Sequence, residues 1–243
     1  MSDQTEPDNA TQQTWKPLNA RQRRVLGTLM EKSKTTPDAY PMSFAGLTTG
    51  CNQKSNRAPI MNLTQEQVEE TVHQMRLFGS VTLVQGSGRV DKIRHNGYQW
   101  LGLNKIEAAV MTELLLRGEQ TLGELRTRAS RMEPIPDLDQ LKSLLDGLKE
   151  RDLVVELTPP GRGQLVTHNI YPEWELEALK KVVAAGGIPL QSDEDDDTPV
   201  QAAPGASGTS PGLAAQMSEL KQTVERLSER IAFLEEQLGV KLS

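Results

Sequence analysis

Three things are scarce in this chain of 243 residues: cysteine, aromatic side chains and long apolar runs. Its single cysteine, Cys51, excludes an intrachain disulfide and fits a reducing cytoplasm. No apolar stretch approaches the roughly 20 residues that cross a bilayer, so no membrane partner is expected. Aromatic residues make up 4% and hydrophobic residues 36%, which indicates that part of the chain joins no core. The polar residues 1–16 are typical of a disordered segment and not of a signal or transit peptide.

The net charge of −6 argues against a general nucleic-acid binder, but the charge is unevenly distributed. Residues 18–102 hold eleven Lys or Arg and six Asp or Glu, a net of +5. Residues 103–183 hold eleven against fourteen, and residues 184–243 hold four against ten. Contacts with a polyanion are therefore expected in the first part of the chain.

Constellations of catalytic or metal-binding residues are lacking. The three histidines, His73, His95 and His168, fall in unrelated segments, and no Cys/His cluster has metal-ligand spacing. Cys51 has no recognisable base partner, so we expect a small buried residue. The glycines near positions 86 and 161 lie in expected hairpin tips and not between a strand and a helix, as a phosphate loop would require. The sequence predicts a protein that is not an enzyme and has no cofactor.

The helical pattern begins after residue 17. Asn19 is a suitable N-cap for a first helix, and Ser43 for a short helix over residues 43–49. Thr64 and Gln67 form a capping box that opens a third helix, which ends at Gly79. The apolar side of this third helix is expected to consist of Val68, Val72, Met75 and Leu77.

Two β-like runs follow the third helix, at residues 81–84 and 90–94, around a glycine turn. Three helices followed by a hairpin is the order of a winged helix-turn-helix. The same order then recurs. Residues 18–19 and residues 103–104 are both Leu-Asn. At the same offset of 85, Val110, Met111 and Leu114 match Val25, Leu26 and Leu29.

The second copy carries its own start signals. Asn104 with Glu107 and Thr121 with Glu124 are capping boxes, and a third helix is expected over residues 138–151. Strands are expected at residues 153–158 and 164–170, and a helix over about residues 174–185 should pack back on this module. The predicted fold is mainly α with small β-hairpins, an α+β class of two tandem winged helices over residues 17–102 and 103–185.

Residues 186–213 are rich in Gly, Pro, Ser and Asp and are typical of a flexible acidic linker. Residues 214–241 then show an apolar spacing that alternates three and four, as a heptad seam requires. Leu at every d position with β-branched residues at two a positions favours a parallel dimer; an amphipathic helix lying on the second module is the alternative. The seam residues are Met217, Leu220, Val224, Leu227, Ile231, Leu234 and Leu238.

Nucleic-acid contacts are best sought outside the third helices. Glu66, Glu69 and Glu70 on the exposed side of the first module's third helix would face phosphates, which is unfavourable. Amide and guanidinium groups in the polar loop and in the hairpin could contact phosphate oxygens instead. These candidates are Lys54, Asn56, Arg57, Arg89, Lys92 and Arg94; for the loop residues, satisfaction of local backbone groups is the alternative.

Long motifs link the chain to a known family. Residues 36–43 (TPDAYPMS) and 51–63 (CNQKSNRAPIMNL), with residues 114–121 (LLLRGEQT) and 123–129 (GELRTRA), resemble the YceH-like family of uncharacterised bacterial proteins. The resemblance covers about residues 18–171. It implies tandem winged-helix domains in a cytoplasmic protein and supplies no mechanism.

Two functions remain open at this point. The first is a DNA-associated regulatory protein that a coiled coil joins into dimers, which raises avidity through effective concentration. The second is a protein–protein adaptor that uses winged helices without binding DNA, an analogy at the level of the fold. Convergence of the loop and hairpin basic residues on one face would favour the first, and their dispersal or pairing would favour the second.

Overall fold

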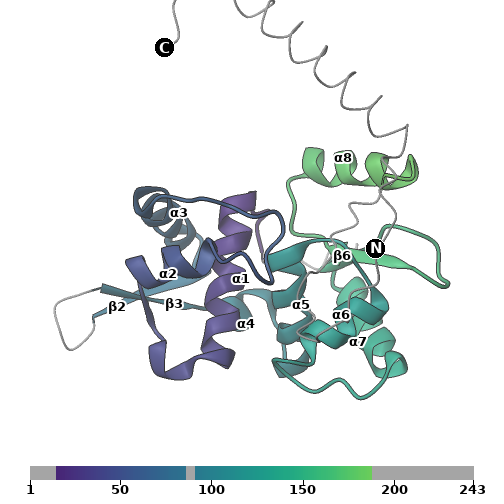
Figure 1. Ribbon diagram of the computed structural model, residues 1–243, viewed down its shortest axis with the longest axis horizontal. Helices are drawn as coiled ribbons and strands as arrows, with labels where there is room; N and C mark the ends of the chain where they lie inside the picture. The colour runs from purple at the N-terminus through teal and green to yellow at the C-terminus, as the bar shows by residue number, and fades with distance from the viewer. Residues whose placement is uncertain (1–14, 86–90, 188–243) are drawn as a thin grey trace, which may run out of the picture. The chain divides into compact units, whose positions relative to one another are not determined.

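The computed structural model describes residues 15–85 and 91–187, and all of them fall within one compact unit. The fold is mixed α and β, mostly helical, with two three-stranded antiparallel sheets (Figure 1). No helix within these ranges is long and apolar enough to cross a membrane. Most of the predicted linker, the predicted coiled coil and Arg89 lie outside the described residues.

The first module, residues 15–102, starts its helices where the sequence predicts. Asn19, Ser43 and Thr64 each accept a hydrogen bond from the backbone of the first helical turn, which confirms them as N-caps. Its sheet has the order β1-β3-β2, and the two-residue strand β1 was not predicted because it is too short to show a period. The elements are α1 (Ala20–Thr35), η1 (Pro37–Ala39), β1 (Met42–Ser43), α2 (Phe44–Cys51), α3 (Gln65–Leu77), β2 (Val81–Gln85), β3 (Asp91–His95) and α4 (Gly97–Leu101).

The second module, residues 103–187, repeats this order, which confirms the internal repeat. Both predicted capping boxes, at Asn104 and at Thr121, are present. The sheet order β4-β6-β5 is the counterpart of β1-β3-β2. The elements are α5 (Lys105–Arg117), β4 (Gln120–Thr121), α6 (Leu122–Ala129), α7 (Leu138–Glu150), β5 (Val154–Glu156), β6 (Leu165–His168) and α8 (Glu173–Ala184).

The two modules pack through their first helices, α1 and α5, which lie next to each other between the two sheets (Figure 1). The apolar residues that match at the offset of 85 are all fully buried there. Gly27 allows the close approach: a Cβ at this position would lie 2.9 Å from the Leu116 side chain of α5. The absence of a side chain at one position therefore sets the spacing of the two helices.

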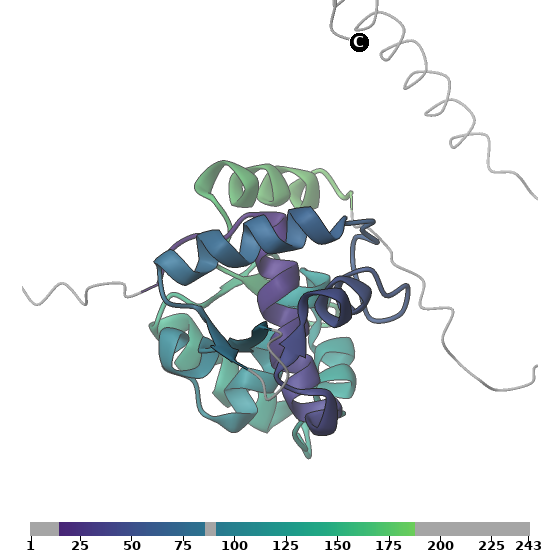
Figure 2. The same cartoon turned by 90° about the vertical axis from the view of Figure 1, so that its left-hand side faces the viewer.

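Two segments pack differently from the sequence prediction. Trp15 falls in the expected disordered segment, yet it is buried in the core, and Leu18 N donates to Ile170 O at 2.8 Å in the second module. The trailing helix α8 is expected on the second module. Its Glu175, however, is ion-paired with Arg23 of α1, so the start of α8 also contacts the first module. Figure 2 shows α8 (green) above the upper end of α1 (purple).

Candidate functional site

The loop between α2 and α3, residues 52–64, joins the two modules. Asn52 closes the loop because its side-chain amide exchanges two hydrogen bonds with the backbone of Leu63, both of 2.8 Å. At the middle of the loop, Ala58 N donates to Leu116 O of α5 at 3.0 Å. The polar stretch without periodicity is therefore an ordered loop that contacts the neighbouring module.

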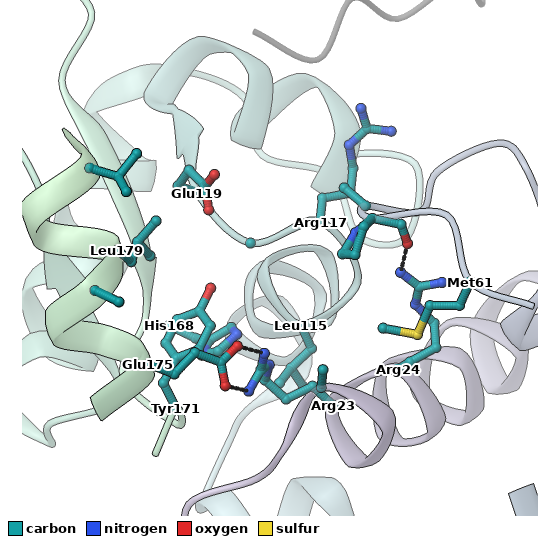
Figure 3. A pocket seen from close by; sticks show the side chains of 16 residues that line it. Arg23, Arg24, Met61, Leu115, Arg117, Glu119, His168, Tyr171, Glu175 and Leu179 are labelled. Carbon is teal, nitrogen blue, oxygen red and sulfur yellow. Dashed lines mark hydrogen bonds and ion pairs between the residues drawn. The ribbon is translucent and has the colours of Figure 1, made fainter. Parts of the chain in front are cut away.

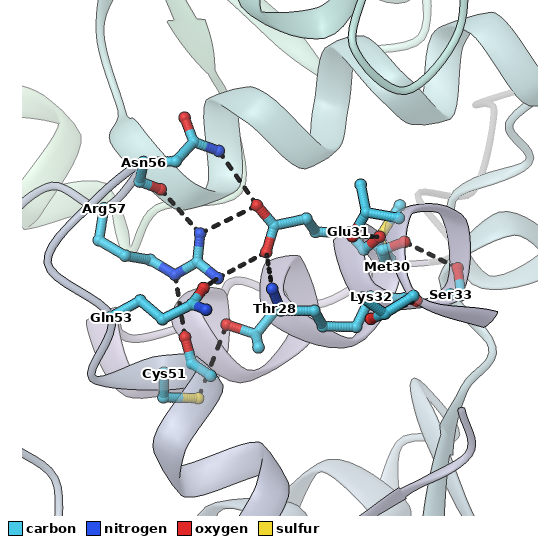
Figure 4. Close-up of polar contacts among 12 residues, drawn as sticks. Thr28, Met30, Glu31, Lys32, Ser33, Cys51, Gln53, Asn56 and Arg57 are labelled. Carbon is cyan, nitrogen blue, oxygen red and sulfur yellow. Dashed lines mark hydrogen bonds and ion pairs between the residues drawn. The ribbon is translucent and has the colours of Figure 1, made fainter. Parts of the chain in front are cut away.

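Arg57 lies inside this loop, and every one of its N–H donors has an acceptor within the protein (Figure 4). Nη1 and Nη2 donate to the two carboxylate oxygens of Glu31 at 3.1 and 2.6 Å. The three remaining donors bond to Gly50 O, Asn56 O and Gln53 Oε1. The guanidinium is buried, so it has no donor left for a phosphate oxygen.

Asn56 connects this ion pair to the second module. Its Nδ2 donates to Glu31 Oε1 at 3.2 Å and to Glu113 Oε2 of α5 at 3.3 Å, and its Oδ1 accepts from Arg131 Nη2 at 2.8 Å. Burial works to raise the pKa of Glu31, but the hydrogen bonds and charge of Arg57 outweigh it and the pKa is lowered. At Glu113, burial prevails and the pKa is raised. Two of the three candidate loop residues are therefore bonded inside the protein: Asn56 contacts both modules, and Arg57 anchors the loop to Glu31 of α1.

Of the other candidates for nucleic-acid contact, Lys54 and Arg94 are exposed and Lys92 is half-buried. Lys54 lies at the surface of the loop. On β3, Ile93 points into the core, so its neighbours Lys92 and Arg94 project from the outer face of the sheet. Arg89 lies outside the described residues. Two of the six candidates, Asn56 and Arg57, therefore lie in the joint between loop and helices. Of the other described candidates, Lys92 and Arg94 share one face of β3, and Lys54 lies apart from them in the loop.

The exposed side of α3 is acidic, as predicted, but it also carries an apolar residue. Leu77 is 89% exposed, so its assignment to the buried side of α3 is wrong. The reason is geometric: at about 100° per residue, position 77 lies half a turn away from Val68. The helical period alone could have identified Leu77 as a surface residue.

A groove lies between α3 and the start of α8. Glu70 and Gln74 of α3 line it on one side and Trp174 of α8 on the other. Trp174 is 73% exposed, and together with Leu77 and Val182 it is one of the large hydrophobic side chains that the described chain leaves in solvent. No pattern in the sequence indicated that the first turn of α8 lies beside α3.

A separate pocket of about 450 Å³ lies where α1, α5, the loop and α8 meet (Figure 3). Arg23 and Arg24 of α1 line it together with Leu115 of α5, Met61 of the loop and Leu179 of α8. Arg23 stacks on the ring of Tyr171, 4.4 Å from its centroid, and binds Glu175. The pocket thus takes its walls from both modules and from the trailing helix.

Cys51 and His168 are buried in the core, His95 is half-buried, and His73 is exposed on α3. Cys51 is buried, as expected, and burial raises the pKa of its thiol to about 11. Burial lowers the pKa of His95 to about 4, and its ring bonds to Ser33 and to Gly97 N. His168 is buried beside Tyr171, and its pKa lies well below the ordinary value. Among the described residues, no group of three or more His, Cys, Asp or Glu is arranged to hold a metal ion.

Comparison with known proteins identifies the family. Residues 18–162 match the model of a protein family of unknown function, DUF480. The chain is 49% identical to a UPF0502 protein of Rhodopirellula baltica over 84% of this chain and 87% of that protein. It is 35% identical to a UPF0502 protein of Paraburkholderia xenovorans over 93% of each chain. The chain therefore belongs to the UPF0502 family of uncharacterised bacterial proteins, in agreement with its YceH-like motifs.

Proposed function

We propose that this protein is a cytoplasmic tandem winged-helix adaptor that binds a protein partner through the exposed surface of α3 and the start of α8. The element order and the sheet order of each module support a winged-helix assignment, in which α3 and α7 would be the recognition helices. That resemblance supports the fold assignment. The choice between nucleic acid and protein as the partner depends on the chemistry of the exposed surface.

The observation that carries the proposal is the exposed face of α3. Glu66 and Glu70 would repel phosphates, whereas Leu77, 89% exposed, offers an apolar contact. Trp174 adds an exposed aromatic ring at the adjoining groove. Aromatic and apolar side chains inside a polar rim are typical of protein interfaces, and the carboxylates select a basic partner.

The rigid joint between the modules supports the same proposal. The network of Glu31, Asn56 and Arg57 ties the loop of one module to α5 of the other, so a partner would meet both modules as one unit. Because every N–H donor of Arg57 is used within the protein, this residue has none left to contact a phosphate.

A second function, DNA association, is supported by one specific observation. Lys92 and Arg94 project from the same outer face of β3, in the hairpin that would be the wing, and Lys54 is exposed in the loop. Backbone contacts by such residues need no sequence reading. These three residues, with Arg89 at the expected hairpin tip, make the DNA hypothesis testable.

Dimerisation through residues 217–238 completes the proposal. The heptad seam supports a parallel two-stranded coil, and a dimer would present two adaptor surfaces at once. Ile231→Lys places a charge in the seam. We expect it to halve the mass found by light scattering, whereas Arg226→Ala, outside the seam, should leave the mass unchanged. An unchanged mass for Ile231→Lys would exclude this segment as the dimer contact.

Two experiments separate the two functions. A photoreactive amino acid at position 77 should cross-link a protein in cells, and Glu66→Lys with Glu70→Lys should abolish the product. The same amino acid at Lys142, exposed on α7, is the control. Equal labelling from both positions would contradict the adaptor proposal. In parallel, a DNA shift at about 50 mM salt that Lys92→Glu with Arg94→Glu abolishes would favour the DNA hypothesis.

A further inference from the structure

The groove between α3 and α8 continues into the exposed side of α3. Glu70 and Gln74 line the groove, and Leu77 lies within about 20° of Glu70 around the helix, at about 100° per residue. The helical rise places Leu77 about 10 Å beyond Glu70 along the axis. All three side chains are exposed. A carboxylate in the groove and an apolar side chain two turns further on are therefore open to the same ligand.

Trp174 forms the opposite wall of the groove and is 73% exposed. The groove has a volume of about 470 Å³, which is the size of a site for a small molecule or for single side chains. An indole ring open to solvent attracts cations to its face, and the planar guanidinium of arginine stacks on it better than the ammonium of lysine. The apolar stem of an arginine also covers the walls of a groove. The groove therefore has the shape and chemistry to hold one arginine side chain.

The charges around the groove favour a cation. Along α3 and α8, no Lys or Arg lies within one helical turn of Glu70 or Trp174. Glu175 also lines the groove, but its ion pair with Arg23 compensates its charge. Arg21 of α1 is the cation in the lining. It is outnumbered by Glu70 and by the carboxylates within one turn of Glu70 or Trp174, which are those of Glu66, Glu69, Glu173 and Glu177.

We propose that the partner of this surface is a basic amphipathic helix that lies along α3, with an arginine in the groove and an apolar side chain on Leu77. The arginine stacks on Trp174 and bonds to Glu70. An arginine and an apolar residue seven positions apart in a helix are also about 10 Å apart on one face, which matches the spacing on α3. The surface of α3 offers no strand edge, so the partner must satisfy its own backbone, as a helix does. The inference rests on the proposed adaptor function and names the element that the adaptor binds.

The test uses a helical peptide of about 16 residues, built from alanine and glutamine, with one arginine and one leucine seven positions apart. Both orders of the two residues are made, and each peptide is titrated into the full-length protein. NMR follows the indole N–H signal of Trp174, assigned with Trp174→Phe, which should shift while that of the buried Trp15 does not. Citrulline keeps the planar end of arginine without its charge, so the citrulline peptide should bind at least about fivefold more weakly. Equal affinities, or no binding up to about 5 mM in either order, would overturn the proposal.

Two variants locate the contact. Glu70→Gln should reduce the preference for arginine over citrulline to below about twofold, whereas Glu150→Gln, exposed on α7, should leave it at the wild-type level. An unchanged preference in Glu70→Gln would show that the arginine does not bind at the groove. The cross-link from position 77 separates this inference from the adaptor function. If the cross-link forms in cells but no peptide binds, the arginine-bearing helix is wrong and the adaptor stands; if both fail, neither stands.

Discussion

Arg57 and Glu31 form a two-bond ion pair in which the arginine side chain has no contact with solvent. The pair spans 26 positions of the sequence and fixes the loop of the first module against α1. Because Asn56 bonds to the same carboxylate and to Glu113, the pair is also part of the joint between the modules.

Loss of Arg57 should therefore destabilise the fold. Arg57→Met leaves the Glu31 carboxylate buried without its cation, and we expect a loss of about 3–5 kcal/mol in the free energy of unfolding. Urea denaturation followed by tryptophan fluorescence measures it. Glu31→Gln combined with Arg57→Met should recover part of the loss, and Lys54→Ala, on the exposed side of the loop, should change stability by less than about 0.5 kcal/mol. A loss of under about 1 kcal/mol in Arg57→Met would show that the pair contributes little.

The spacing of α1 and α5 predicts a strong effect at Gly27. Gly27→Val places a branched side chain where even a Cβ lies 2.9 Å from Leu116, and we expect a loss of about 1–3 kcal/mol from overpacking. Gly147 of α7 is the matched control, since a Cβ there meets no atom within 4 Å. Gly147→Ala should stabilise the protein by about 0.5–1 kcal/mol through helix propensity. Thermal unfolding should show a lower melting temperature for Gly27→Val and a higher one for Gly147→Ala. An unchanged melting temperature for Gly27→Val would contradict the close packing of α1 and α5.

Acid should destabilise the protein through its buried histidines. Burial lowers the pKa of His95 to about 4 from 6.5, so the unfolded chain takes up a proton between these pH values and the folded chain does not. Stability is therefore present above pH 6.5 and falls as the pH drops towards 4. His95 should contribute a loss of about 2 kcal/mol between pH 6.5 and 5. His168, with its pKa also lowered, adds a loss in the same direction.

Urea denaturation at a series of pH values measures this dependence. His95→Gln should unfold with a shallower dependence on pH than the wild type, whatever its stability at neutral pH. Gln99→Asn, at an exposed position of α4, changes no titratable group and should reproduce the wild-type slope. An unchanged slope in His95→Gln would mean that this imidazole is accessible to protons in the folded state.

The ion pair between Arg23 and Glu175 should control the docking of α8. Glu175→Gln weakens the bonded contact between α8 and α1, so amide hydrogen exchange over residues 173–184 should become about tenfold faster. Exchange in α1 and α5 should stay unchanged, because their packing does not depend on α8. Glu177→Gln, exposed on the same helix, is the control, and equal exchange in both variants would show that the apolar side of α8 is sufficient for docking.

The helix starts were predictable because their causes are local. Asn19, Thr64, Asn104 and Thr121 each bond to a backbone amide three positions further on, and a capping box needs no information about the rest of the fold. The internal repeat was equally visible, since the same apolar spacing recurs at an offset of 85. The two-residue strands β1 and β4 could not be predicted because they form only by pairing with β3 and β6.

The candidate site was predictable only in part. Lys92 and Arg94 are placed on one face by strand alternation, which the sequence contains. Arg57 is buried because it is ion-paired with Glu31, and no pattern between positions 31 and 57 indicates that the two side chains meet. The pocket at Arg24 requires four segments, which begin at positions 20, 58, 115 and 168, to come together.

By itself, the sequence determined the family, the repeated order of elements and the residues that begin each helix, because neighbouring residues and fixed spacings carry that information. The tertiary structure alone decided which charged residues are buried in ion pairs and hydrogen bonds and which remain on the surface. The reason is physical: burial and ion pairing depend on distances between segments far apart in the chain, and these distances exist only once the core has packed.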